Sequence, residues 1–255
     1  RQDKLFILSQ EQVAELGIEE EFLQPALERS EDIIGIHFNE TPSSYFFVCQ
    51  EPLPQLRLLY PNAYRWVQQW SNAVNKKGIP LSDLFDHDTR EWYTLKPEDP
   101  ANIFVSINPN ERIFFGFSEE KIYLNQRLVA IRVADEDVWL YAALLNSIVS
   151  LLVVEFNGVS RNLGALDLNA DMFKSKMKIF DPALLSQDAK DRIVHAFEPV
   201  ANRTVLSFRD EFISIDRRHF DEVVLAEFGY DTEYVPKLYN ILIQIITDRI
   251  EMKDR

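Results

Sequence analysis

The sequence predicts an α+β protein with two parts: a strand-rich, mixed part over residues 1–184 and a helical part over residues 185–255. Up to about residue 180, short apolar runs of strand length are rich in branched and aromatic side chains. Beyond this point, apolar residues recur at helical spacing between residues that start and stop helices. With 255 residues, of which 46% are hydrophobic, the chain is long enough to bury a large core.

Four elements are expected in the first hundred residues. Apolar runs at residues 5–8 and 45–49 have the length of strands. Ser9 and Gln12 stand three residues apart, as in a capping box at the start of a helix. A proline in the first turn, apolar residues at helical spacing and a following glycine predict a second helix over residues 61–77.

The middle of the chain is expected to contain most of the strands. Apolar runs predict strands at residues 103–107, 112–117 and 127–133. The acidic residues 135–137 then favour the start of a helix, which is expected to run over residues 138–156. A further strand is expected over residues 174–180, where an Asp-Pro pair follows and ends it.

The last seventy residues are expected to be helical. Ser186 starts the first of these helices, and Pro199 is expected to break or kink it. Gly229 separates two later helices as a stop signal. Further helical stretches are expected over residues 204–212, 218–228 and 234–252. We expect this part to serve for packing and for contact with partners.

The most apolar window, residues 138–156, predicts a buried helix and not a membrane span. It contains Glu155, whereas a spanning helix needs about 20 nearly uncharged residues. No secretory signal opens the chain, and the single cysteine, Cys49, excludes an internal disulfide and a zinc site built from cysteines. We therefore expect a cytoplasmic protein. Because the chain begins with Arg1 and not with Met, we also expect it to be part of a longer protein.

The charge of the chain is acidic, with 27 basic and 41 acidic residues and a net charge of -14. Such a chain is not expected to coat nucleic acid through bulk positive charge. The acidic excess is uneven, since residues 101–180 carry 8 basic and 9 acidic side chains whereas residues 1–100 carry 9 and 17. Residues 101–180 are therefore the least repulsive part of the chain for a polyanion.

The motifs of several common catalytic sites are missing. No two of the seven glycines have G-x-G spacing, and none precedes Lys-Ser or Lys-Thr, which excludes a Rossmann fingerprint, the usual methyl-donor loop and a P-loop. The four histidines form no close ligand pair. Asn108-Pro109-Asn110 lacks the second proline and the aromatic residue of the amino-methyltransferase motif, so we interpret it as a turn.

Two alternative functions follow from other patterns. Asp99, Glu119 and Lys121 fit the loose spacing of metal-dependent nucleases, in which two carboxylates bind Mg²⁺ and a lysine orients water. This pattern also arises by chance in an acidic chain. The second alternative is a protein-interaction module that uses the helical part as a subunit-docking or homodimer surface.

Four stretches together carry a family resemblance. They are residues 125–132 (NQRLVAIR), 144–147 (LLNS), 164–168 (GALDL) with 176–182, and 221–224 (DEVV) through Gly229-Tyr230. In this order they resemble the C-terminal target-recognition region of adenine-N6 DNA methyltransferases from restriction–modification systems, the TaqI-like specificity domain. The resemblance covers roughly residues 90–255.

The resemblance implies a division of work within a longer protein. A catalytic domain upstream would bind S-adenosylmethionine and methylate adenine, with DNA cleavage as a further activity left open. This chain would hold and read double-stranded DNA and would contain neither a catalytic residue, a metal site nor a cofactor of its own. Its partners would be the duplex and that upstream domain, with no membrane, and a homodimer through the helical part stays open.

A lobe that grips a duplex needs cations and amides at phosphates and a few polar side chains at base edges. Candidates on predicted strands are Arg112, Gln126, Arg127 and Arg132, and candidates in a loop between two glycines are Asn157, Ser160, Arg161 and Asn162. Lys174, Lys176 and Lys178 are spaced by two, which would place them on one face of a strand. The alternative for these lysines is a solvated edge strand.

Overall fold

The computed structural model describes residues 3–75, 77–81, 83, 91–160 and 165–251. Most of its strands precede residue 132 and its long helices follow residue 137, which confirms the α+β class. The chain divides into two compact units. Unit 1 consists of residues 1–28, 40–100 and 122–125, and unit 2 consists of residues 29–39, 101–121 and 126–255.

In the sheet of unit 1, β3 lies between β1 and β2. β3 (Ser44–Phe47) runs antiparallel to β1 (Ile7–Ser9) and to β2 (Leu23–Leu27). The last two residues of β5 (Gly116–Leu124) pair in parallel with β2. The helices of this unit are α1 (Asp3–Phe6), α2 (Gln10–Leu16), α3 (Leu53–Leu59) and α4 (Pro61–Gln69).

The capping box at the start of α2 is confirmed, because Gln12 N donates to Ser9 Oγ at 3.2 Å and Ser9 N donates to Gln12 Oε1 at 2.9 Å. The strand expected over residues 5–8 is partly wrong. Its first two residues belong to α1, which shows that an apolar run of four cannot distinguish helix from strand. The helix expected over 61–77 ends at Gln69, and turns follow in which the Asn75 side chain accepts two backbone N–H groups.

Unit 2 contains β4 (Ala101–Ser106) and β6 (Leu128–Ile131), which pair antiparallel, and the beginning of β5 beside β4. The strand expected over 112–117 begins only at Gly116. Phe115, the residue before this strand, bonds instead to the side-chain amide of Asn146. The amide accepts from the N–H of Phe115 at 3.0 Å and donates to the carbonyl of Phe115 at 2.8 Å. A side chain thus takes the place of a strand partner.

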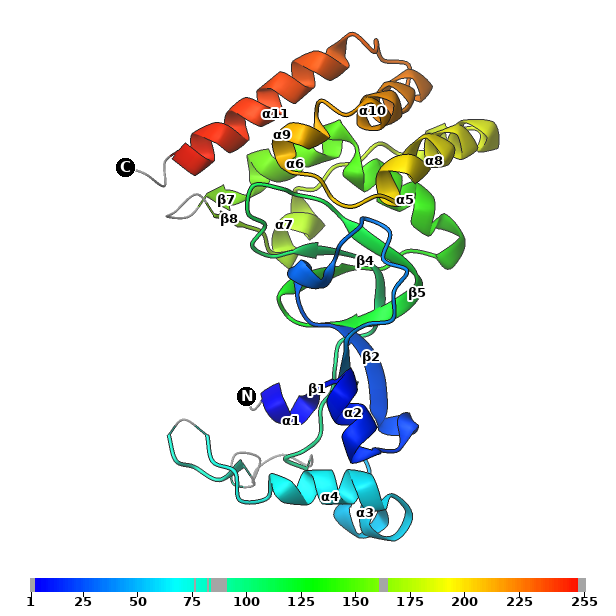
Figure 1. The fold of residues 1–255 in the computed structure, drawn as a ribbon. Coiled ribbons are helices and arrows are strands. Elements are labelled where there is room, and N and C mark those ends of the chain that lie inside the picture. Colours follow the sequence, from blue (N-terminus) through cyan, green and yellow to red (C-terminus); the bar gives the residue numbers. More distant parts are fainter. Residues whose placement is uncertain (1–2, 76, 82, 84–90, 161–164, 252–255) are drawn as a thin grey trace. The chain divides into compact units, whose positions relative to one another are not determined.

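The helices of unit 2 form layers over these strands (Figure 1). α5 contacts β4 and α8, α11 contacts α6, and α10 packs against α8. Leu144 and Ile148 are fully buried in the resulting core, as expected. The helices are α5 (Val138–Asn146), α6 (Ile148–Asn157), α7 (Ala170–Ser175), α8 (Gln187–Ala201), α9 (Phe208–Glu211), α10 (Ile215–Glu227) and α11 (Tyr234–Glu251).

The single helix expected over 138–156 is broken at Ser147 into α5 and α6, which bend by 66°. Ser147 has an extended backbone, and its side chain caps α6 at Ser150 N. Among the described residues, no single helix is long and apolar enough to cross a membrane; the bent pair passes by length and composition only.

The strand expected over 174–180 is wrong. Asn169 caps a helix by accepting from Met172 N at 2.8 Å, and α7 buries Met172, so Lys174 lies in a helix and Lys176 at its end. Pro199 does not break α8, which continues to Ala201. The boundary expected at 184/185 falls inside unit 2, because one core contains apolar residues from both sides of it.

A buried charge cluster holds the break between α5 and α6. Arg217 and Asp221, one turn apart on α10, are fully buried and form an ion pair at 2.8 Å. Asp221 accepts from Ile148 N at 2.8 Å, and Arg217 donates to the carbonyl of Asn146 at 2.6 Å. The hydroxyl of Tyr239 on α11 donates to Asp221 at 2.7 Å. The cluster therefore ties α10 and α11 to both sides of the break.

Removing the Asp221 carboxylate should destabilise the protein severely. Asp221→Ala leaves the buried Arg217 without its hydrogen-bonded carboxylate and with only Glu211, at 3.7 Å, which costs about 3 kcal/mol in the free energy of unfolding measured with urea. Glu222→Ala is the matched control, since Glu222 forms the same i,i+4 pair with Arg218 at the surface and is worth less than about 1 kcal/mol. Equal losses in the two variants would show that the buried pair does not hold the fold.

Candidate nucleic-acid interface

The structure places most of the expected DNA-contacting residues at the surface. Arg161 and Asn162 lie outside the described residues. Asn157 is half-buried, and its amide donates to the carbonyl of Val153 in the preceding turn at 2.8 Å. Arg112 is buried. The exposed members are Gln126, Arg127, Arg132, Ser160, Lys174, Lys176 and Lys178.

Backbone hydrogen bonds bring three segments of unit 2 together. Ile107, after the end of β4, donates its N–H to the carbonyl of Arg127 at 3.0 Å and accepts at its own carbonyl from Leu168 N at 2.7 Å. Leu168 follows β8 (Leu166–Asp167), which pairs with β7 (Val159–Ser160). The turn before β6, the end of β4 and the β7–β8 hairpin are therefore neighbours.

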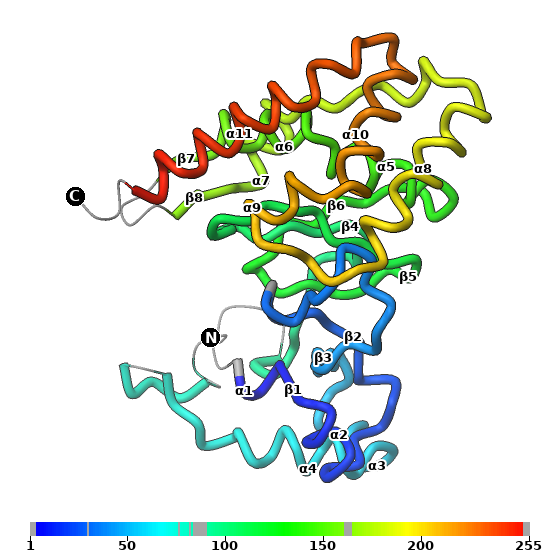
Figure 2. Tube along the Cα trace, turned by 45° about the horizontal axis from the view of Figure 1, so that its top comes forward, coloured from blue at the N-terminus to red at the C-terminus, as the bar shows by residue number. Residues whose placement is uncertain are grey.

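The lysines come from the segment that follows the hairpin. Asn169, directly after Leu168, caps α7, and Figures 1 and 2 show α7 beside β7 and β8. We define the hairpin–α7 surface as Asn108 together with the exposed candidate DNA-contacting residues of these neighbouring segments, which also expose Asn169, Asp171 and Ser175. Its members are Asn108, Gln126, Arg127, Ser160, Lys174, Lys176 and Lys178.

Arg132 does not belong to this group of neighbours. It follows the last residue of β6, whereas Arg127 precedes the first, so the length of the strand separates them. Gln126 and Arg127 lie in a turn and not on a strand as expected. The three lysines do not share a strand face, although all three are exposed.

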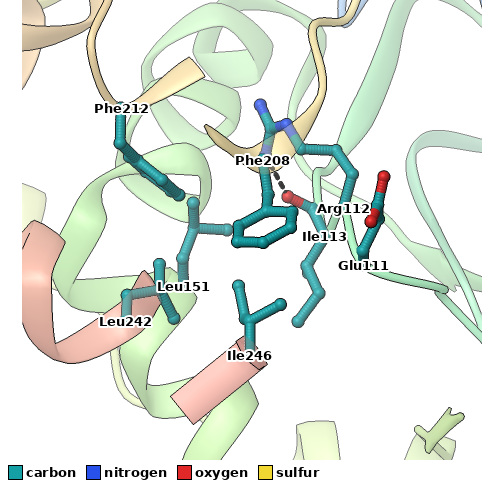
Figure 3. A pocket seen from close by; sticks show the side chains of 8 residues that line it. All are labelled: Glu111, Arg112, Ile113, Leu151, Phe208, Phe212, Leu242 and Ile246. Atoms are coloured by element: carbon teal, nitrogen blue, oxygen red, sulfur yellow. Dashed lines mark hydrogen bonds between the residues drawn. The ribbon is translucent and has the colours of Figure 1, made fainter. Parts of the chain in front are cut away.

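Arg112 was expected at the DNA surface, and the structure contradicts this. Its side chain is only 9% exposed, and its Nη2 lies 3.2 Å from Oε1 of the fully buried Glu211. Figure 3 shows Arg112 at the edge of a small cavity beside the ring of Phe208, and it also donates to the carbonyl of Ile113. The guanidinium therefore faces the interior of unit 2, where it partly neutralises a carboxylate.

Glu211 is the centre of this second charge cluster. Besides Arg112, it faces Arg203 at 3.0 Å and Arg217 at 3.7 Å. Burial tends to raise the pKa of Glu211, but the three positive charges outweigh this and hold the pKa below its usual value. Burial lowers the pKa of Arg112 to about 10, against the opposing effect of Glu211. Both groups are thus charged at neutral pH.

One polar residue of the surface, Asn108, was not singled out from the sequence as a DNA contact. Asn108 is exposed, and its Nδ2 donates to Oδ1 of Asp167 at 3.1 Å. Asn108 had been interpreted as part of a turn only. No local pattern links it to a residue 59 positions later, so the pair is visible only in the fold.

The nuclease alternative finds no support in the arrangement of its residues. Glu119 accepts from the indole N–H of Trp139 at 3.1 Å, and Lys121 pairs with Asp135 at 2.8 Å. Asp99 belongs to unit 1, whereas Glu119 and Lys121 belong to unit 2. Within the part of the chain that the structure describes, no group of three acidic, histidine or cysteine side chains has a geometry suited to a metal ion.

Comparison with known proteins gives a structural likeness. No family model matches the sequence, and no curated protein matches it. Among solved structures, the chain is similar to the type IIG restriction endonuclease BpuSI, with a TM-score of 0.59 and 15% sequence identity. The chain shares the fold of part of that enzyme. The likeness covers 99% of this chain and 29% of the BpuSI chain, so this chain spans less than a third of the length of BpuSI.

Replacing Arg112 should affect stability and not a surface function. Arg112→Ala leaves Glu211 with one partner fewer in the interior, and we expect a loss of about 3 kcal/mol in the free energy of unfolding. Arg127→Ala, which removes an exposed guanidinium, should change the free energy of unfolding by less than about 0.5 kcal/mol. Urea denaturation of both variants measures the difference, and a stable Arg112→Ala protein would contradict the interior role.

The Glu211 cluster should also make the protein sensitive to acid. In the folded protein the pKa of Glu211 lies below its ordinary value of 4.5. The ionised carboxylate therefore contributes its full stabilisation of the fold above pH 4.5. As the pH falls below it, the unfolded chain binds the proton first, and stability decreases until the folded carboxyl also titrates. We expect the free energy of unfolding between pH 6 and 3 to fall more steeply in the wild type than in Glu211→Gln. Parallel curves would refute this origin of the acid sensitivity.

Proposed function

We propose that this chain recognises double-stranded DNA as part of a restriction–modification enzyme. The hairpin–α7 surface is the observation that carries the proposal, because it combines cations and amide or hydroxyl groups from neighbouring segments. Phosphates are bound by cations, and base edges are read by amides and hydroxyls. The shared fold with part of a type IIG restriction endonuclease supports the restriction–modification context.

The local charge of this surface favours a polyanion, although the whole chain carries -14. The segments that form the surface (106–108, 126–127, 159–160 and 166–178) contain four cationic side chains, Arg127, Lys174, Lys176 and Lys178. The same segments contain two carboxylates, Asp167 and Asp171. Charges further away than a Debye length, about 8 Å at physiological ionic strength, are largely screened. Within these segments basic side chains therefore outnumber acidic ones by two.

The finer role follows the sequence resemblance. We propose that the chain is the target-recognition part of an adenine-N6 methyltransferase, and that S-adenosylmethionine binds to a separate catalytic domain. An enzyme that acts on a base must take it out of the stack, so a second lobe has to hold the duplex meanwhile. On this proposal the chain contributes binding and sequence reading in the cytoplasm, and it takes no part in the methyl transfer itself.

Binding of the chain to a short duplex, followed by fluorescence anisotropy, tests the proposal. With four cations in contact with phosphates, the logarithm of affinity should fall with the logarithm of salt concentration with a slope of about -3.6. Lys174→Ala with Lys176→Ala should make that slope less steep by about 2 and weaken binding at low salt by about tenfold or more, because two phosphate contacts are lost.

Lys190→Ala with Lys237→Ala is the matched control, since it removes the same charge from α8 and α11. It should leave the salt slope unchanged, as neither lysine belongs to the hairpin–α7 surface. If both double variants weaken binding equally, the effect comes from net charge and not from this surface. If the wild type shows no salt-dependent binding at all, the proposed function is wrong.

A further inference from the structure

Asn108 occupies a fixed position on the hairpin–α7 surface. Its backbone N–H faces the hydroxyl of Ser106 at 3.3 Å, and the residue before it, Ile107, is held on two sides by Arg127 and Leu168. The residue after it, Pro109, is buried and has a restricted backbone. The chain thus presents the exposed side chain of Asn108 from a rigid support.

The contact with Asp167 fixes which way the amide group of Asn108 points. An ionised carboxylate accepts hydrogen bonds and cannot donate them. The Nδ2 of Asn108, and not its Oδ1, must therefore face Asp167, as observed at 3.1 Å. This uses one of the two amide hydrogens. The other amide hydrogen and Oδ1 have no further hydrogen bond to a described residue, so one donor and one acceptor of the same amide remain available.

This donor–acceptor pair matches one base in the major groove. Adenine presents an acceptor, N7, beside a donor, the N6 amino group, and asparagine binds both at once. Guanine presents two acceptors, N7 and O6, so Oδ1 of a fixed asparagine would face O6 without a hydrogen between them. An amide that is free to rotate would not make this distinction as strictly.

We propose that Asn108 reads an adenine in the recognised DNA sequence and that Asp167 is the positioning residue for its amide. The inference rests on the proposed function, since it assigns base reading to the same surface, while the lysines hold the phosphates. It identifies Asn108 as a specificity-determining residue that the sequence pattern did not indicate.

Selection of duplexes from a randomised pool by the full chain tests this inference. The wild type should prefer adenine at one position, and replacing that adenine with 7-deazaadenine, which lacks N7, should weaken binding about 5- to 150-fold. In Asn108→Ala the preference at this position should disappear and the 7-deaza substitution should have no further effect, because the two changes remove the same contact. Asn110→Ala, an exposed asparagine two residues away, is the control and should keep the preference.

Asp167→Asn tests the positioning role separately. An amide at this position donates as well as accepts, so Asn108 becomes free to rotate by half a turn. We expect the discrimination between adenine and guanine to fall at the position where the wild type selects adenine. The dependence of affinity on salt concentration should not become less steep, since no cation is removed. Unchanged discrimination in this variant would show that Asp167 does not orient Asn108.

The outcomes separate the two proposals. If the wild type binds DNA with salt dependence but selects no adenine, or if Asn108→Ala selects the same sequences, the inference about Asn108 is wrong and the proposed function stands. If the wild type does not bind DNA in the salt titration, the proposed function fails and the inference fails with it.

Discussion

The fold of unit 2 depends on a buried ion pair between Arg217 and Asp221. Two charges without any exposed surface are costly unless other polar groups face them. Here the carbonyl of Asn146 and the N–H of Ile148, on the two sides of Ser147, bond to the pair, whereas Nη1 of Arg217 faces Glu211 at 3.7 Å without a hydrogen bond. A continuous helix would use these same groups for its own hydrogen bonds. The ion pair can bond to these groups only because the helix is broken at Ser147. In turn, the break leaves the carbonyl of Asn146 and the N–H of Ile148 without helical partners, and the ion pair satisfies both.

The break in turn determines the structure on both of its sides. At the end of α5, the Asn146 amide bonds to both backbone groups of Phe115, so β5 starts only after it. On the other side, α6 leads directly into β7 of the hairpin. The hairpin is thus attached to a helix whose first residue is fixed by Asp221. Sites that hold a ligand in one geometry are usually supported in this way, by elements whose own positions are fixed by packing.

Local signals in the sequence predicted local structure well, and contacts between distant residues explain the rest. The capping residues Ser9 and Ser186 and the stop at Gly229, which has a φ of 77°, were all visible in short windows. The alternation of lysines after residue 174 resembled a strand, but the cap at Asn169 gave a helix instead. Among the candidate residues, Arg127 and the three lysines are exposed as a surface role requires, whereas Arg112 is not, because its partner Glu211 lies 99 residues later in the chain. The contact of Asn108 with Asp167 likewise joins distant residues and has no local signal in the sequence.

The distribution of charge, more than its sum, decides what the hairpin–α7 surface can bind. The near-neutral stretch of residues 101–180 contains eight basic side chains, and their surroundings differ. Arg112 neutralises an interior carboxylate, and Lys121 pairs with Asp135 at the surface. Four others are exposed on segments that carry two carboxylates. On the proposed function, the net charge lowers the affinity for a polyanion, while the local excess of basic side chains determines the position at which it binds. On the proposed function, a surface with so small a local excess of positive charge needs additional contacts from elsewhere for tight binding.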